Sequence, residues 1–472
     1  MRTHTIKSLH LLSAFGALLV LQGCTTELLK VTDPDIILDE TLKASSASGA
    51  QGLHNGAILR LEQATAGTQQ PDALFVFGGL LTDEWQSGDT FIQRNTMDQR
   101  IWDPQNTFNA GPYRNLNRVR VLAEAAINGL RQYKPTPATN IGRMFAFIAY
   151  VETLIGEHYC NGTPLSDLEG SEVVPGQPIS NDSMFALALA YSDSAAANLG
   201  GGDSAKVARL IKVVRGRALL DRGQFAAAAA AVAGVPDDFH YDVEYSIVAG
   251  DNQIWALNTS ARRYTLADTI GVGPNVGEGI NGLNYRGARD PRVPTRVASG
   301  STNRIFDTAF PMQVVRQGIW GRESPVKIAS GIEARLIEAE AALQAADPAT
   351  WLGKINQLRG TAKIGLLPVP VDTNYRPVAG TKLDSLPDPG SSTNDALRIN
   401  LMFRERAFWM FGTGHRLGDM RRLMRQYGRT ENQVYPIGPW FKGGNYGDAI
   451  QMPVPFDEQN NPNFVTCTDR NP

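Results

Sequence analysis

The feature that most restricts the fold is a recurring pattern of apolar residues three and four positions apart, which marks four separate segments of the chain. In the second segment, apolar residues from Val207 to Leu219 form one helical stripe, Gly223 turns the chain, and Phe225 opens an alanine-rich helix. Apolar stripes at this spacing indicate amphipathic helices, and the breaks between them indicate short turns. We therefore expect about four antiparallel helical hairpins, near residues 115–160, 181–236, 326–363 and 395–428.

The order of helix, glycine turn, aromatic residue and alanine-rich helix resembles a tetratricopeptide-type hairpin. Between the helical segments, residues 83–112, 237–325 and 364–394 are rich in Gly, Pro, Asn, Asp and Ser. Loops of this length usually carry function or are disordered. With 472 residues, the chain suits either two domains or an elongated stack of repeats. The predicted fold class is mostly α, with tetratricopeptide-like hairpins, long irregular insertions and few short strands.

The N-terminus has the charge and hydropathy pattern of a secretory signal peptide. Arg2 and Lys7 precede an apolar run from Leu11 to Leu21 that is too short to span a membrane. The following "LQGC" resembles the lipobox of bacterial lipoproteins, in which the cysteine is acylated and becomes the new N-terminus. We therefore assign residues 1–23 to a lipoprotein signal peptide, 24–50 to a lipidated tether anchored in membrane lipid at Cys24, and 51–472 to the body. The alternative is an ordinary secretory signal with a free thiol at Cys24.

Charge and cysteine content narrow the possible partners. The formal net charge is −2, with no long basic run outside the arginine-rich C-terminal region, so nucleic acid is not expected as a partner. Two cysteines remain after Cys24, and Cys160 and Cys467 either form a disulfide or stay separate thiols. A disulfide would hold the C-terminal tail, which otherwise frays.

Motifs of catalysis and cofactor binding are mostly absent. The glycine-rich stretches "GVGPNVG" and "GTGHRLG" have the third glycine one position late for a dinucleotide loop, and no "GK[ST]" follows. The chain has no G-x-S-x-G elbow and no HExxH, and His158 has the pattern of a helix-end residue without a second ligand pair. We expect no cofactor, no metal and no enzymatic activity. Paired carboxylates for glycoside hydrolysis remain open, because they are recognised by their spatial separation.

Charged residues on the predicted helices favour ion pairing. Arg335 lies three residues before Glu338, and the arginines from Arg398 to Arg425 alternate with Glu405 and Asp419. Pairs between helices explain these arginines better than an anion-binding patch does.

Several stretches, taken in order, resemble the SusD/RagB family of nutrient-binding lipoproteins. They are "GTPLS" at 162–166, the "DPR" of Asp290 to Arg292, "EARLIEAEAAL", "INQLRG", "FRERAFWMFGTGHRLGDMRR" and "NPN" near the end. The resemblance spans essentially the whole chain after the lipobox. It implies a helical protein that faces the cell exterior at the outer membrane and covers a SusC-like TonB-dependent barrel as a lid. Such a protein captures an oligosaccharide or peptide without catalysis. A secreted hydrolase and a tetratricopeptide-type adaptor that binds only protein are the alternatives.

Candidate ligand contacts come from the loops, because a sugar offers apolar ring faces and hydroxyl edges to aromatic and polar side chains. Loop tryptophans and tyrosines with nearby Asn and Arg residues meet this description, whereas Trp351 and Trp409 lie on helical stripes and are expected to pack. Each candidate could equally be a core residue. The candidates are Trp85, Arg94, Trp102, Asn281, Tyr285 and Trp320.

Overall fold

The computed structural model describes residues 44–67, 72–169, 172–266, 282–297, 300, 303–310, 312–378, 381–390 and 395–464. The predictions for residues 1–43, including the acylation of Cys24, therefore lie outside the described residues. The same holds for Asn281 and Cys467.

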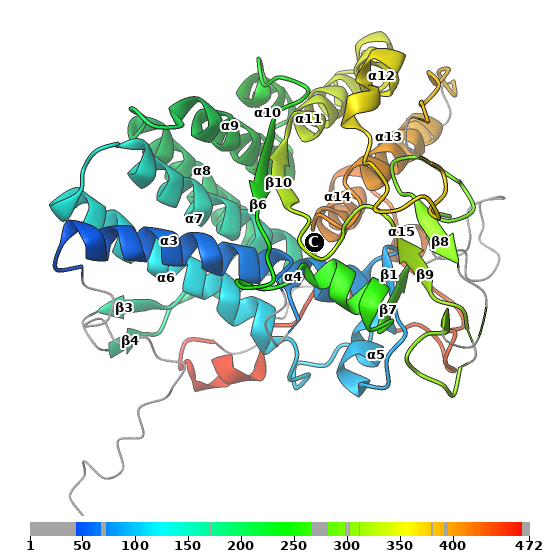
Figure 1. Ribbon diagram of the computed structural model, residues 1–472, viewed down its shortest axis with the longest axis horizontal. Coiled ribbons are helices and arrows are strands. Elements are labelled where there is room, and N and C mark those ends of the chain that lie inside the picture. Colours follow the sequence, from blue (N-terminus) through cyan, green and yellow to red (C-terminus); the bar gives the residue numbers. More distant parts are fainter. Residues whose placement is uncertain are drawn as a thin grey trace, which may run out of the picture.

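Most of the described chain is helical, and the long helices follow one another in an arc (Figure 1). Helix α6 (Ala110–Tyr133) packs against α3 (Ala47–Thr65) and α7 (Thr139–His158), and α7 packs against α8 (Asn181–Ala197). The pairs continue with α9 (Ser204–Asp221) against α10 (Phe225–Val232), and α11 (Gly331–Gln344) against α12 (Pro348–Arg359). Helices α13 (Ala396–Trp409) and α14 (Arg416–Tyr427) complete the arc. The predicted class of a mostly helical, hairpin-based fold is confirmed.

The turn predicted at Gly223 shows why the pattern was readable from sequence. Gly223 has φ of 69°, a left-handed conformation that glycine adopts without steric cost, and Phe225 begins α10 two residues later. Both Val207 and Leu210 are buried. The glycine turn and the continuous apolar stripe therefore both indicate the α9–α10 hairpin that the structure contains.

Helix α3 begins at Ala47, within the range assigned to the tether, and was not predicted from the sequence. Ser46 accepts a hydrogen bond from Gly49 N at 3.1 Å and caps the first turn. The buried face consists mainly of small residues such as Ala50 and Ala57, together with His54. A Cβ added to Gly129 of α6 would lie 3.4 Å from the Ala50 Cβ, so the two helices approach closely. Small residues allow this packing but give a weak apolar pattern.

The connecting regions contain short antiparallel strand pairs and short helices. Strand β1 (Trp85–Ser87) pairs with β7 (Tyr264–Leu266), β6 (His240–Val243) with β10 (Val326–Ser330), and β8 (Thr295–Val297) with β9 (Val315–Gln317). Near residues 160–180, β2 (Thr163–Pro164) pairs with β5 (Pro178–Ile179), and β3 (Asp167–Glu169) with β4 (Glu172–Val174). Helices α4 (Leu74–Phe77), η2 (Gly78–Leu81), α5 (Ile92–Asp98), η3 (Trp255–Ser260), η5 (Thr361–Leu366), α15 (Glu431–Val434) and η7 (Phe456–Asn460) complete the described elements.

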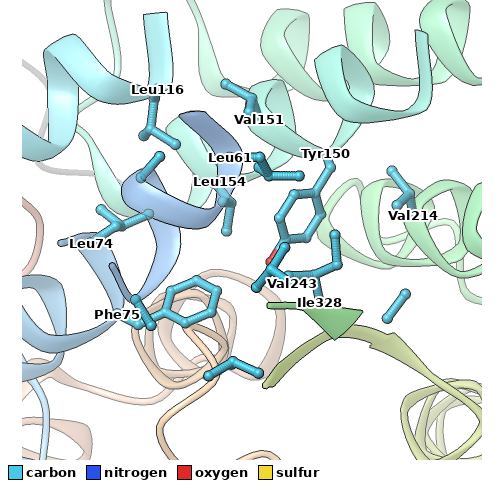
Figure 2. Close-up of a cluster of buried hydrophobic side chains, with 14 of the residues drawn as sticks. Leu61, Leu74, Phe75, Leu116, Tyr150, Val151, Leu154, Val214, Val243 and Ile328 are labelled. Atoms are coloured by element: carbon cyan, nitrogen blue, oxygen red, sulfur yellow. The ribbon is translucent and has the colours of Figure 1, made fainter. Parts of the chain in front are cut away.

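The main core joins the helices to the β6–β10 strand pair. Figure 2 shows Leu61 of α3, Leu154 of α7 and Val214 of α9 facing Val243 and Ile328 of the two strands. All five side chains are buried. Tyr150 lies in the same cluster, and burial raises the pKa of its hydroxyl above the usual range. The strand pair thus anchors the long insertion 237–325 to the packed long helices α3, α6–α14, which we call the helical array.

Ion pairs between helices run through the C-terminal half, as predicted. Arg406 of α13 contacts Asp419 of α14 at 2.8 Å, and Arg422 of α14 pairs with Glu340 of α11. Arg335 and Glu338 form the predicted pair within α11 at 2.9 Å. These side chains are 13% exposed or less, so the arginines hold helices together and do not form an anion-binding patch.

His158 is a structural residue at the end of α7. Its Nδ1 lies 2.9 Å from Leu154 O, and its backbone carbonyl accepts a hydrogen bond from Met452 N at 2.8 Å. Burial lowers the pKa of this histidine to about 4, so its imidazole is neutral near pH 7. None of the helices in the described part of the chain is both long enough and apolar enough to cross a membrane.

Candidate ligand-binding surface

The surface around α5 concentrates exposed aromatic side chains over a fixed polar layer. Phe91, at the N-cap of α5, is 44% exposed, and Phe306 of the following insertion is 38% exposed. Trp102, beyond the other end of α5, is 36% exposed. We call Phe91, Ile92, Trp102, Arg263 and Phe306 together the α5 surface. Of these, Phe91 and Phe306 both contact Arg263, and neighbouring exposed apolar side chains often mark a binding site.

Arg263 holds the two phenylalanines in place. Its guanidinium lies 5.0 Å from the ring centre of Phe91 and 3.9 Å from that of Phe306. It also forms an ion pair with Asp89 at 2.5 Å, and its side chain is 24% exposed. The two rings therefore flank a cation whose charge is already balanced, which fixes the orientation of both aromatic faces.

Backbone hydrogen bonds attach the Phe306 loop to the end of the β1–β7 pair. Phe306 N donates to Arg262 O, and Asp307 N donates to Gly88 O, both at 2.9 Å. Lys442 lies beneath this loop with a side chain only 3% exposed, and its Nζ contacts Asp307 Oδ2 at 3.1 Å. The loop is therefore anchored on both sides, although it has no regular secondary structure of its own.

A buried carboxylate network supports α5 from below. Arg94 pairs with Asp72 at 2.6 Å and also with Asp89, the partner of Arg263. Asp98 Oδ2 accepts hydrogen bonds from Ser87 N and from Trp440 Nε1, both at 2.9 Å. Burial raises the pKa of Asp98 to about 7. A helix of seven residues thus obtains its position from tertiary contacts.

The structure corrects three of the predicted ligand contacts. Trp85 is 1% exposed, Arg94 is 1% exposed and Tyr285 is fully buried, so none of them presents surface to a ligand. Trp85 packs against Phe411 with ring centres 5.2 Å apart, and Tyr285 packs against the same ring at 4.9 Å. Aromatic residues from different loops converge on Phe411, two residues beyond the end of α13, and become core because their apolar faces cover one another.

The three remaining residues that were predicted to contact a ligand lie in three different places. Trp102 is exposed at the α5 surface, and its contact with a ligand stays a prediction. Trp320 is 6% exposed and lines a separate pocket. Asn281 lies outside the described residues. Phe91 and Phe306 were not among the predicted contacts, although their placement in the polar stretches "DTFIQRN" and "NRIFDTAF" was a usable signal.

The chemistry available at this surface is that of binding. Aromatic faces beside a charge-balanced arginine can contact the apolar face of a ring. Among the described residues, no group of three or more His, Cys, Asp and Glu side chains is arranged to hold a metal ion.

Comparison with solved structures identifies the fold. A SusD-like carbohydrate-binding protein from Bacteroides fragilis matches with a TM-score of 0.64 at 12% identity, covering 89% of this chain and 99% of that one. Surface glycan-binding protein A from Bacteroides thetaiotaomicron, solved with laminarihexaose, matches with a TM-score of 0.58 at 10% identity and the same coverages. A laminarin-binding SusD-like protein matches with a TM-score of 0.54 at 14% identity, covering 90% and 99%.

No protein-family model and no curated protein matches the chain. The structural matches extend over nearly nine-tenths of the chain and almost all of each matched protein. The chain therefore has the SusD-like fold, as the resemblance in sequence predicted.

Proposed function

We propose that this protein is a non-catalytic, lipid-anchored binder that captures an oligosaccharide on the α5 surface and delivers it to a SusC-like TonB-dependent transporter. The observation that carries the proposal is the arrangement of Phe91 and Phe306, both exposed, on either side of Arg263. Such rings offer platforms for the apolar faces of sugars. Because the platforms are already ordered, little side-chain entropy is lost when a ligand binds.

The comparisons support a carbohydrate as the ligand class. Two of the matched proteins are described as laminarin-binding or as a complex with laminarihexaose. At 10–14% identity, these matches establish a common fold, and the choice of ligand for this chain depends on its own surface. A peptide ligand is the other class that the resemblance in sequence suggests.

The proposed location and partner depend on the N-terminus and the fold together. An acylated Cys24 would hold the body at the outer membrane, facing the cell exterior, and several acyl chains would make that attachment firm. A barrel transporter in another chain would then receive the captured nutrient. Co-purification of a large outer-membrane barrel with the detergent-solubilised protein would support this part, whereas repeated recovery without a barrel would contradict it.

Calorimetry of the full-length protein in detergent, against a panel of neutral oligosaccharides and peptides, tests the ligand class. We expect saturable binding of an oligosaccharide, which product analysis recovers intact. The double substitution Phe91→Ala and Phe306→Ala should weaken binding by about tenfold or more, because each aromatic contact contributes of order 1 kcal/mol. Phe456→Ala is the matched control, since Phe456 is 49% exposed on η7.

Three results would contradict the proposal. Cleaved ligand would indicate a hydrolase. Saturable binding that ignores the double substitution would remove the site from the α5 surface. Saturable binding of peptides alone would exclude the oligosaccharide.

A further inference from the structure

A concave site lies between the end of α13 and strand β10, and it shares no lining residue with the α5 surface. Its volume is about 80 Å³, and its lining includes Trp320, Phe408, Trp409, Lys327, Ser330 and Arg292. We propose that this pocket is a second binding subsite, which takes a sugar ring carrying an anionic substituent such as a carboxylate or a sulfate ester. The inference rests on the proposed function of glycan capture and adds a ligand class to it.

The aromatic wall of the pocket is rigid. Gln317 Oε1 accepts hydrogen bonds from Ile319 N at 2.7 Å and from Trp320 N at 2.8 Å, while its Nε2 donates to Trp320 O at 2.9 Å. The Trp320 ring stacks on Phe411 with centres 6.5 Å apart and an angle of 24°. Three hydrogen bonds from one side chain therefore hold the loop, and the ring face is ordered before any ligand arrives.

The rest of the lining suits a ring with an apolar face. Ile319, Pro325, Ile332, Leu366 and Pro368 contribute aliphatic surface beside Trp320. Ser330 Oγ accepts a hydrogen bond from Glu333 N at 3.1 Å, which leaves its O–H able to donate. An apolar pocket with a small number of placed polar groups is typical of a small-molecule site.

The charges around the pocket leave one cation in excess. Arg292 lies in the lining, but it pairs with Asp290 and Glu405, each at 2.7 Å, and Arg359 also contacts Glu405 at 2.8 Å. Two guanidinium groups therefore face two carboxylates, and their charges balance.

Lys327 is exposed at the pocket and has no ion-pair partner within the described ranges. Its cross-strand neighbour Asp242 instead contacts His240 Nδ1. An ammonium group without a carboxylate partner, in a pocket that is also lined by aromatic side chains, matches the chemistry of an anionic sugar.

The test uses calorimetry of the full-length protein in detergent with three probes: a neutral oligosaccharide, a uronate-containing oligosaccharide and a sulfated oligosaccharide. Lys327→Met removes the charge and keeps much of the side-chain length. We expect it to weaken binding of at least one anionic probe by about tenfold, the scale of one charge-assisted contact, and to leave the neutral probe unchanged. Lys327→Arg should restore most of the loss.

Lys382→Met is the matched control, because Lys382 is 58% exposed and, among the described residues, forms its ion pair with Asp384 at 3.4 Å. The preference for an anionic probe should also fall as salt is added, since the contact is partly exposed to solvent. Comparison of the uronate-containing and the sulfated oligosaccharide shows which anionic group the pocket binds.

The outcomes separate this inference from the proposed function. If Lys327→Met and Lys382→Met behave alike with both anionic probes, the pocket is not an anionic subsite, whatever the Phe91 and Phe306 variants show. If Lys327→Met weakens anionic binding but the Phe91→Ala and Phe306→Ala double variant binds normally, the pocket is an anionic subsite and the α5 surface is not the main binding site. If none of the probes binds, both are overturned.

Discussion

The helical array and the α5 surface use the same residue types, arginine with carboxylate and aromatic partners, to opposite effect. In the array, Arg217 of α9 and Glu157 of α7 are 3% and 5% exposed, and their contact at 2.5 Å lies inside the packed helices. At the α5 surface, Arg263 is 24% exposed and lies between two phenylalanines that face solvent. Buried pairs set how helices fit together, whereas the partly exposed pair orients rings that stay available for contact.

The comparison also separates the energetic roles of the two regions. A buried ion pair adds little to stability compared with a well-packed apolar alternative, but removing one partner is costly because the other charge stays buried. At the edge of the molecule, water solvates a charge that has lost its partner. The four predictions that follow test this difference between the buried interior and the exposed surface, beginning with the largest expected effect.

Replacing one buried arginine should reveal the dependence of the array on its ion pairs. Arg217→Met leaves Glu157 without its cation and also removes the hydrogen bond to Gly414 O at 3.0 Å, so we expect unfolding free energy to fall by about 3–5 kcal/mol. Arg215→Met, on the same helix, breaks an exposed pair with Asp193 and should cost about 0–1 kcal/mol. Urea denaturation measures the unfolding free energy of both variants. Equal losses would show that the buried and the exposed ion pair have the same effect on stability.

Two tryptophans from one stretch of sequence should behave differently. Trp85→Ala removes a buried ring from the core and should destabilise the protein by about 3–5 kcal/mol. Trp102→Ala should destabilise the protein clearly less than Trp85→Ala, since Trp102 is 36% exposed, and should weaken oligosaccharide binding. Thermal unfolding and calorimetry together measure these effects. A stable Trp85→Ala protein that has lost binding would reverse the assignment.

The C-terminal tail provides a test by disulfide removal. Cys160 is disulfide-bonded, and we propose Cys467 as its partner. Asn461 and Asn463 donate hydrogen bonds to Gly176 O and Pro175 O at 3.0 and 2.9 Å, which brings the tail to the loop that follows Cys160. Cys467→Ser should lower stability by about 2–4 kcal/mol. Peptide mapping without reductant identifies the pair, and a Cys24–Cys160 peptide would show that the assignment is wrong.

The pKa of Asp98 predicts a small pH dependence beneath the α5 surface. Because burial raises this pKa to about 7, above its unfolded value near 4, the folded state binds the extra proton between these values. Stability should therefore fall by about 1 kcal/mol as pH rises from 6 to 8.

Asp98→Asn should remove that loss, because both donors contact the same oxygen, Oδ2, and an amide oxygen can accept from both. Denaturation of both proteins at pH 6 and pH 8 provides the measurement. Parallel pH profiles for the two proteins would show that Asp98 does not titrate in this range.

Where the local pattern was strong, the sequence was sufficient to predict structure. The α9–α10 hairpin followed from one apolar stripe and a glycine turn, and the pairing of Arg406 with Asp419 followed from alternating charges on successive helices. Helix α3 was missed because its buried stripe includes alanines and His54. Helix α5 was missed because seven residues produce no readable periodicity.

By itself, the sequence determined the helical hairpins, the turns between them and the expectation that loops carry the ligand site, because spacing and turn chemistry act over a few residues. Only the tertiary structure decided which of the loop aromatic residues are buried and which are exposed. Trp85 and Phe91 are six residues apart in the same polar stretch, yet the first packs against Phe411 and the second faces solvent. Burial of a loop residue depends on partners hundreds of positions away, and no local pattern encodes those partners.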